Sequence, residues 1–133
     1  MNEEILIFDR SKEAGEALAR EIRSAYKRLS GAVFTVRDPE EVFTGPMPEK
    51  PFAAFFVFGG MYDAEAARKF HAIWSGVPVV VVSEGGEGAE DAVMAFPLGA
   101  CDYLVRPITA EKLKEAVKRC ANHQAHVGCI HPG

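Results

Sequence analysis

The sequence predicts an α/β domain in which a parallel sheet is covered by helices on both faces. Two observations support this prediction. Short apolar runs alternate with segments of helical periodicity, and strands that alternate with helices pair in parallel through right-handed crossovers. The chain has 133 residues, of which 48% are hydrophobic and 26% charged, as is usual for a single globular domain.

Five apolar runs have the length and composition of strands. They lie at 5–8, 32–36, 52–58, 77–82 and 103–105. The first is a continuous run of branched and aromatic residues, as expected of a strand that is buried on both faces. The third is the most apolar, and Gly59 and Gly60 end it.

Helical periodicity follows the first strand. Ser11 is expected to cap a helix and Gly31 to end it. Between them, apolar residues recur at helical spacing, namely Ala14, Leu18, Ile22, Ala25 and Leu29. The second strand leads instead into 38–51, where four prolines predict a loop with at most one helical turn at 40–43.

Three later segments are predicted to be helical. One begins near Asp63 and ends before Gly76, and the last is capped by Thr109. Between them, 89–96 is helical in character. Pro97 ends or kinks that helix, which shortens it, reshapes the nearby surface, or does both. The buried face of the last helix is formed by Leu113, Ala116, Val117 and Cys120.

Charge and composition exclude several function classes. Fifteen basic and nineteen acidic residues give a net charge of −4, which disfavours direct binding of nucleic acid or a membrane surface. The longest uncharged apolar run, 52–62, is too short to span a bilayer, and the N-terminus lacks the pattern of a signal peptide. The three cysteines have no framework spacing, which fits reduced thiols. We therefore expect a cytoplasmic protein.

The carboxyl ends of the predicted strands carry the candidate site residues, because sites in parallel α/β sheets form there. Asp9 and Arg10 follow the first strand, Phe58 ends the third, Ser83 follows the fourth and Arg106 the fifth. The chain has no dinucleotide or P-loop glycine pattern, and it offers no nucleophile–base pair. We therefore predict that it is not an enzyme.

From about Glu4 to Cys120 the chain resembles the receiver domain of two-component response regulators. The stretch LGACDYLVRPI at 98–108 is similar to the family's LGADDYLVKPF, and VPVVVVS at 77–83 and ILIFD at 5–9 match its fourth and first strands. The resemblance implies a flavodoxin-like (CheY-like) three-layer α/β/α sandwich with five parallel strands in the order 2-1-3-4-5. It also implies that Tyr103 is the switch aromatic of the family.

The residues that carry the family's chemistry differ in this chain. The acidic pair reads Asp9-Arg10, and Phe58 stands where the resemblance places the phosphate-accepting aspartate. Arg106 replaces the lysine before the proline, and Ser83 keeps the hydroxyl. These five residues form a vestigial phosphorylation pocket.

Those substitutions remove the groups that phosphorylation needs. Phosphoryl transfer to a carboxylate requires the carboxylate as nucleophile, and Mg²⁺ requires several oxygen ligands. We predict a pseudo-receiver that is not phosphorylated, has no cofactor and binds Mg²⁺ weakly or not at all. Asp63 is the alternative nucleophile, although it lies about five residues past the strand end.

Two interpretations of the pocket are open. In the first, Asp9 and Arg106 form an ion pair that replaces the metal site; in the second, Arg10, Ser83 and Arg106 bind an anion. Phe58 either plugs the pocket or stacks on a ligand. Ser83, without a phosphate to contact, is expected to hydrogen-bond within its loop.

The predicted function is that of a receiver-like module in phosphorelay-type signal transduction, acting by protein–protein interaction. The expected partner is a histidine kinase, an output domain or a second copy of the chain. A homodimer would use the helix at 89–96, the fifth strand and the last helix, with Tyr103 either held in one rotamer or part of the interface. The alternative is a sensor of small molecules or anions that uses the vestigial pocket.

The domain is expected to cover 1–122, followed by a flexible C-terminal tail at 123–133. The tail holds His123, His126, Cys129 and His131, which are potential zinc ligands. Their spacing matches no standard zinc finger, and short terminal tails are usually disordered. We therefore predict no metal site there.

Overall fold

The structure, a computed structural model, describes residues 3–41, 51–58, 61–74, 76–83 and 100–130. For 58, 61–64, 100, 101, 103 and 123–130 it describes the main chain alone. The helix predicted at 89–96, the loop after Ser83 and Pro97 lie outside the described residues.

Five parallel strands form one sheet in the order β2-β1-β3-β4-β5, as the sequence predicts. The strands are β1 (Glu4–Phe8), β2 (Val33–Arg37), β3 (Ala53–Phe58), β4 (Val79–Ser83) and β5 (Ala100–Val105). The register is regular except between β4 and β5, where it shifts by one residue after Val79. β5 begins three residues earlier than the apolar run at 103–105 indicates.

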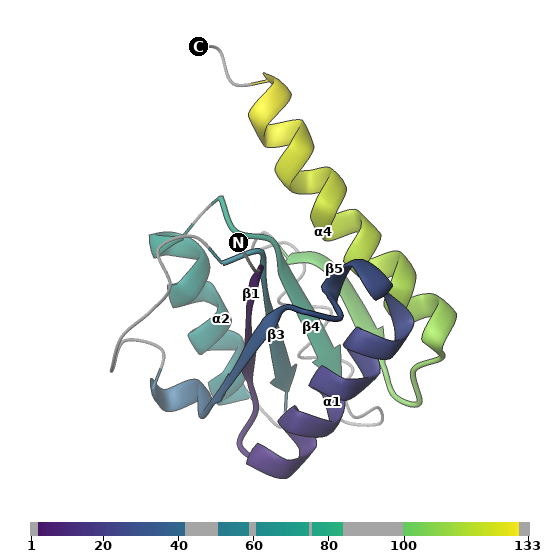
Figure 1. Cartoon of the computed structure of the whole chain (residues 1–133). Helices are drawn as coiled ribbons and strands as arrows, with labels where there is room; N and C mark the ends of the chain where they lie inside the picture. The colour runs from purple at the N-terminus through teal and green to yellow at the C-terminus, as the bar shows by residue number, and fades with distance from the viewer. Residues whose placement is uncertain (1–2, 42–50, 59–60, 75, 84–99, 131–133) are drawn as a thin grey trace.

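In the part of the chain that the structure describes, three helices cover the sheet, with two short 3₁₀ turns. They are α1 (Lys12–Ala25), α2 (Met61–Ile73), α4 (Ala110–Ile130), η1 (Lys27–Leu29) and η2 (Pro39–Glu41). α1 and α4 lie on one face of the sheet and α2 on the other, which gives the three-layer arrangement (Figure 1). None of the described helices is both long and apolar enough to cross a membrane.

α1 begins where the sequence predicts and ends earlier. The hydroxyl of Ser11 accepts a hydrogen bond from the Ala14 N–H at 3.2 Å, which caps the helix. The helix stops at Ala25 because Tyr26 is extended, with φ −133° and ψ 100°. A separate 3₁₀ turn then buries Leu29. The prediction of one continuous helix to Gly31 is therefore wrong, although every apolar position named for it except Ala14 and Ala25 is fully buried.

α4 begins at its predicted cap and is long. Thr109 Oγ1 accepts a hydrogen bond from the Lys112 N–H at 3.2 Å. The helix continues to Ile130, so most of the segment assigned to a tail is helical main chain. Its last turns extend past the end of the sheet (Figure 1). The domain boundary at residue 122 stays a prediction.

Each face of the sheet has its own hydrophobic core. Because successive strand residues point to opposite faces, Ile7 packs against α1 and α4 whereas Phe8 packs against α2. Under α2 the core is aromatic: the Phe8 and Phe56 rings stack with centroids 4.5 Å apart. Phe70 of α2 meets both rings edge-on, at 5.8 and 5.6 Å.

Candidate functional site

The predicted site residues come together at the carboxyl edge of the sheet. Phe58 is in register with Ser83, and Ser83 with Val105. The N–H of Arg106 donates to the carbonyl oxygen of Ser83 at 2.8 Å, and the N–H of Asp9 to that of Arg37 at 2.9 Å. These pairings align the ends of β3, β4 and β5, and they hold the turn after β1 beside the end of β2.

Asp9 is buried at the start of this edge, with 7% of its surface exposed. Its Oδ1 accepts a hydrogen bond from the Ser11 N–H at 2.8 Å, which holds the turn that leads into α1. Gly15 lies close by, since a Cβ on that residue would be 3.4 Å from the Asp9 Cβ. The carboxylate is therefore fixed by the turn and by the first part of α1.

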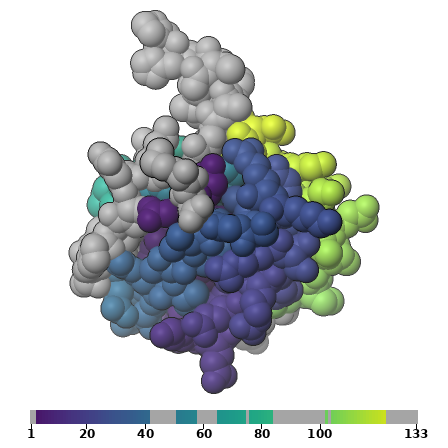
Figure 2. Space-filling view, viewed as in Figure 1, coloured from purple at the N-terminus to yellow at the C-terminus, as the bar shows by residue number. Residues whose placement is uncertain are grey.

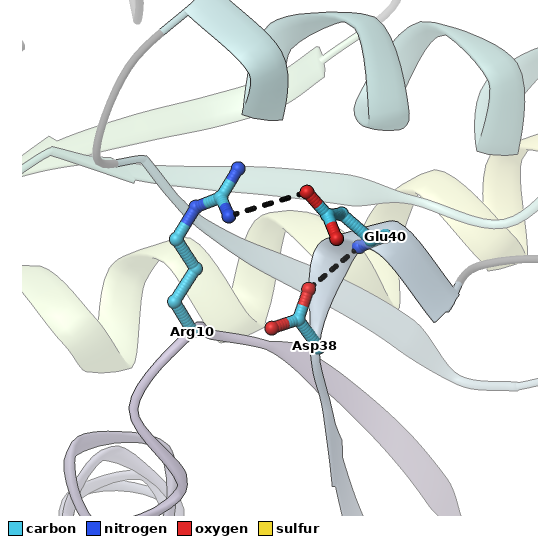
Figure 3. A network of polar contacts seen from close by, with 3 residues as sticks. All are labelled: Arg10, Asp38 and Glu40. Atoms are coloured by element: carbon cyan, nitrogen blue, oxygen red, sulfur yellow. Dashed lines mark hydrogen bonds and ion pairs between the residues drawn. The ribbon is translucent and has the colours of Figure 1, made fainter.

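Arg10 lies on the surface and its side chain points toward Glu40 of η2 (Figure 3). Its Nη1 is 3.7 Å from Glu40 Oε1. The Glu40 N–H in turn donates to Asp38 Oδ1 at 2.8 Å, which positions the 3₁₀ turn. The sequence does not identify Glu40 as a partner of Arg10, because Glu40 lies in the proline-rich segment, where no motif specifies the spacing of residues.

A small groove lies beside Asp9 and Arg10, with a volume of about 320 Å³. Its lining is formed by Asp9, Arg10, Lys12, Val36, Arg37, Asp38 and Glu41. Among these described residues acidic and basic side chains are equal in number, so they contribute no excess of either charge to the groove. Neither Ser83 nor Arg106 is among the residues that line it.

Ser83 is fully buried at the end of β4. Phe58 and Tyr103 are placed in β3 and β5 by their main chains, and Asp63 lies in the first turn of α2. Their side chains are not among those described. The proposed roles of Phe58 as a plug and of Tyr103 as a switch aromatic therefore stay predictions, as does the nucleophilic role of Asp63.

Arg106 has an ionic partner that the sequence did not reveal. Its Nη1 lies 3.9 Å from Glu21 Oε1 on α1, and its side chain is 26% exposed. The peptide bond from Arg106 to Pro107 is cis. The predicted ion pair of Arg106 with Asp9 stays a prediction, and so does an anion site that includes Ser83.

A further ion pair joins β5 to α4. The Arg119 guanidinium contacts the Asp102 carboxylate, whose side chain is 12% exposed. Asp102 lies within the stretch at 98–108 that carries the strongest family likeness, whereas Arg119 lies outside it, and nothing in the local spacing indicates the pair. The two residues are brought together only when α4 folds back over β5.

No group of three or more His, Cys, Asp and Glu residues among the described side chains could hold a metal ion. The candidate zinc ligands His123, His126 and Cys129 lie on α4 without described side chains, and His131 lies outside the described residues.

Comparison with known proteins identifies the fold through structures and not through sequences. No protein-family model matches the chain, and no curated protein sequence matches it. A CheY-like response regulator receiver domain protein from Methanospirillum hungatei JF-1 is 19% identical, with a TM-score of 0.71 over 95% of this chain and 99% of that one. A response regulator from Thermotoga maritima is 21% identical, with a TM-score of 0.68 over 92% and 99%.

The receiver domain of NtrX from Brucella abortus is 20% identical, with a TM-score of 0.73 over 89% of this chain and 98% of that one. These likenesses extend over nearly the whole of each chain and agree with the strand order of the sheet. The chain therefore has the fold of CheY-like response regulator receiver domains.

Proposed function

We propose that the chain is a receiver-like module of phosphorelay-type signal transduction that acts by protein–protein interaction and is not phosphorylated on β3. One observation carries the proposal: Phe58 ends β3 in register with Ser83, at the strand end where the resemblance places the phosphate acceptor. A carboxylate there would be the nucleophile of phosphoryl transfer, and phenylalanine has no nucleophilic atom. The shared fold supports the receiver-like role.

The oxygen ligands near Asp9 support a second part of the proposal, which is that the module works without Mg²⁺. Mg²⁺ prefers near-octahedral coordination by oxygen, usually with one or two carboxylates. Asp9 is followed by Arg10, whose guanidinium carries the charge that the metal would bring. The donor set at these positions does not fit the metal.

The alternative proposal, an anion sensor at the vestigial pocket, is less well supported. It requires Arg10 and Arg106 to direct their charge at one ligand together with Ser83. Arg10 instead lies near Glu40, and Arg106 near Glu21, so each arginine has a carboxylate neighbour on a different element. Both pairs are partly exposed, and each is worth at most about 1 kcal/mol.

The proposed partner is a histidine kinase, an output domain or a second copy of the chain. Part of the surface predicted for a homodimer lies on β5 and α4. Val105 supports this choice, because 40% of its surface is exposed at the end of an edge strand.

A phosphorylation assay tests the proposal directly. The chain is incubated with Mg²⁺ and acetyl phosphate, and intact mass and amide NMR shifts are recorded. We expect no added phosphate and no saturable shift near Asp9, Ser83 or Arg106. A phosphorylated chain would overturn the proposal, and Asp63→Asn would then identify the acceptor.

A gain-of-function variant and its matched control make the absence of phosphorylation in the natural chain informative. The double variant Phe58→Asp with Arg10→Asp restores the nucleophile and the second carboxylate, and it is expected to take up phosphate. The matched control, Phe58→Asn with Arg10→Asp, lacks the nucleophile and is expected to stay unmodified. If the first double variant also fails while remaining folded by NMR, Phe58 does not explain the inactivity and the central observation loses its force.

A further inference from the structure

A second, larger groove lies between α1 and β2, with a volume of about 600 Å³. Its lining is formed by Lys12, Glu16, Ala19, Arg20, Arg23, Phe34, Thr35 and Val36. The two elements lie side by side on the face of the molecule that Figure 2 turns toward the viewer. The groove is open to solvent and not enclosed, so it suits an extended chain better than an enclosed small molecule.

The groove is positively charged, although the chain as a whole is negative. Among the described residues that line it, three basic side chains face a single carboxylate, that of Glu16. Arg23 is held in place, because its guanidinium lies 4.5 Å from the centroid of the Phe34 ring and Nη2 donates to the Ala32 carbonyl at 3.4 Å. No described residue forms an ion pair with Lys12 or Arg20, so their charge is available to a partner.

β2 contributes the unpaired edge of the described sheet to this groove. Within that sheet it pairs with β1 alone. The Val33 N–H and the Arg37 carbonyl point toward β1, where they bond Glu3 and Asp9. Because main-chain groups alternate in direction along a strand, Phe34 and Val36 direct theirs outward. A strand from a partner protein can therefore add to this edge.

The charges on α1 match the repeat of such an added strand. Lys12, Glu16 and Arg20 are spaced by four residues, or about 6 Å along the helix axis. Alternate residues of an extended strand are about 6.6 Å apart and face the same side. The first, third and fifth residues of an added strand would therefore lie opposite a cation, an anion and a cation.

We propose that the groove between α1 and β2 binds an extended acidic segment of a partner protein, which adds to the outer edge of β2. The segment carries acidic residues at its first and fifth positions and a basic or neutral residue at the third, opposite Glu16. This pattern of charges is the same whichever direction the added strand runs. A second copy of the chain is disfavoured as the occupant, since symmetric pairing of two β2 edges would bring two positive grooves together. The proposal does not depend on phosphorylation.

The test uses the full chain and a synthetic peptide, Glu-Val-Lys-Val-Glu, with both ends blocked. We expect saturable amide shifts centred on Phe34 and Val36. The charge-reversed peptide, Lys-Val-Glu-Val-Lys, is expected to bind at least tenfold more weakly, as the loss and reversal of two exposed ion pairs implies. Equal binding of the two peptides, or no shift with either, would overturn the proposal.

Variants locate the site. Arg20→Glu is expected to weaken binding of the first peptide about tenfold, and Glu16→Lys to shift preference toward a peptide with glutamate at its third position. Lys69→Glu makes the same charge change on α2, on the other side of the sheet, and is expected to leave binding unchanged. An equal loss in Arg20→Glu and Lys69→Glu would show net-charge attraction only, which contradicts a specific groove.

Main-chain pairing is tested in the peptide, so that the fold of the protein is not at risk. One version is N-methylated on both valines and another on the third and fifth residues. Only one set of N–H groups faces β2, so only one version is expected to lose binding, and its identity gives the strand direction. Equal behaviour of the two would overturn strand addition. Concentration-dependent shifts of Phe34 and Val36 without peptide would instead assign the edge to a second copy.

Discussion

Gly15 of α1 and Val36 of β2 are in closer contact than any larger residue would allow. A Cβ added to Gly15 would lie 2.5 Å from Cγ1 of Val36, well inside van der Waals contact. Valine is branched at Cβ and cannot swing its methyl groups away without changing rotamer. Glycine at this position therefore lets α1 pack closely on β2, which places Asp9 and the groove between the two elements.

We expect Gly15→Ala to destabilise the protein by about 1–3 kcal/mol, because overpacking outweighs the better helix propensity of alanine. Urea unfolding monitored by circular dichroism measures the change. Gly31→Ala is the control, since nothing lies within 4 Å of a Cβ there. Adding Val36→Ala to Gly15→Ala should recover part of the loss, and a Gly15→Ala variant as stable as the wild type would contradict the close packing.

The aromatic core under α2 depends on Phe70. Its ring contacts Phe8, Phe56 and Trp74, and the side chain is fully buried. Phe70→Ala is expected to cost about 3–5 kcal/mol of unfolding free energy, and Phe70→Leu less. Ile73→Ala, on the same helix but 57% exposed, should change stability by under about 0.5 kcal/mol. Similar losses at the two positions would show that α2 does not pack as described.

The pair of Asp102 and Arg119 is expected to couple β5 to α4. Its carboxylate is nearly buried while the arginine is 56% exposed, so a double-mutant cycle with alanine should give a coupling of about 1 kcal/mol. The exposed pair of Glu3 and Arg28, 3.6 Å apart, serves as the reference and should give about half of that or less. Equal coupling in the two cycles would mean that burial of Asp102 does not strengthen the contact.

Arg10→Asp is expected to create a Mg²⁺ site beside Asp9. The substitution removes the guanidinium next to Asp9 and adds a second carboxylate, which is the kind of ligand the ion prefers. Titration of Mg²⁺ followed by amide shifts near Asp9 measures the binding. Arg68→Asp, an equal charge change at an exposed position of α2, should show no such shifts. Saturable binding by the unaltered chain would contradict the prediction.

Truncation after Asn122 is expected to preserve the fold. Among the described side chains of α4, those that enter the core are Leu113, Ala116, Val117 and Cys120. The remaining turns, to Ile130, extend beyond the sheet, so their removal should change the unfolding free energy by under about 0.5 kcal/mol. Thermal unfolding of chains ending at 122 and at 115 makes the comparison. The shorter chain should fail to fold, and loss of fold at 122 would place the domain boundary later.

The fold could be predicted because its signals are local. The continuous apolar runs identify strands buried on both faces, and Ser11 and Thr109 cap the helices that they were expected to cap. The predicted end of α1 is wrong because Leu29 keeps the apolar spacing of the helix, while the main chain changes from helical to extended at Tyr26. Periodicity reports which side chains are buried, and it does not report a break in main-chain hydrogen bonding.

The site could be predicted in position and not in its contacts. Parallel strands place their carboxyl ends together, so Asp9, Ser83 and Arg106 were expected at one edge, and their main chains lie there. The partners of the arginines were missed because Glu21 and Glu40 lie on other elements, at distances in sequence that no motif specifies. Which carboxylate a long arginine side chain contacts depends on distances in the folded structure, and the sequence does not give these distances.

The register shift between β4 and β5 decides on which face of the sheet the side chains of β5 lie. Ala100 pairs with Val79 and Asp102 with Val80, so Cys101 is an additional residue on β5. Without the shift, Cys101 would lie opposite Val80, and Asp102 and Leu104 would turn to the other face of the sheet: the leucine would leave the core beneath α4, and the carboxylate would face the α2 side, away from Arg119. The shift thus keeps Asp102 opposite Val80 and Leu104 opposite Val82, on the face of the sheet that α4 covers.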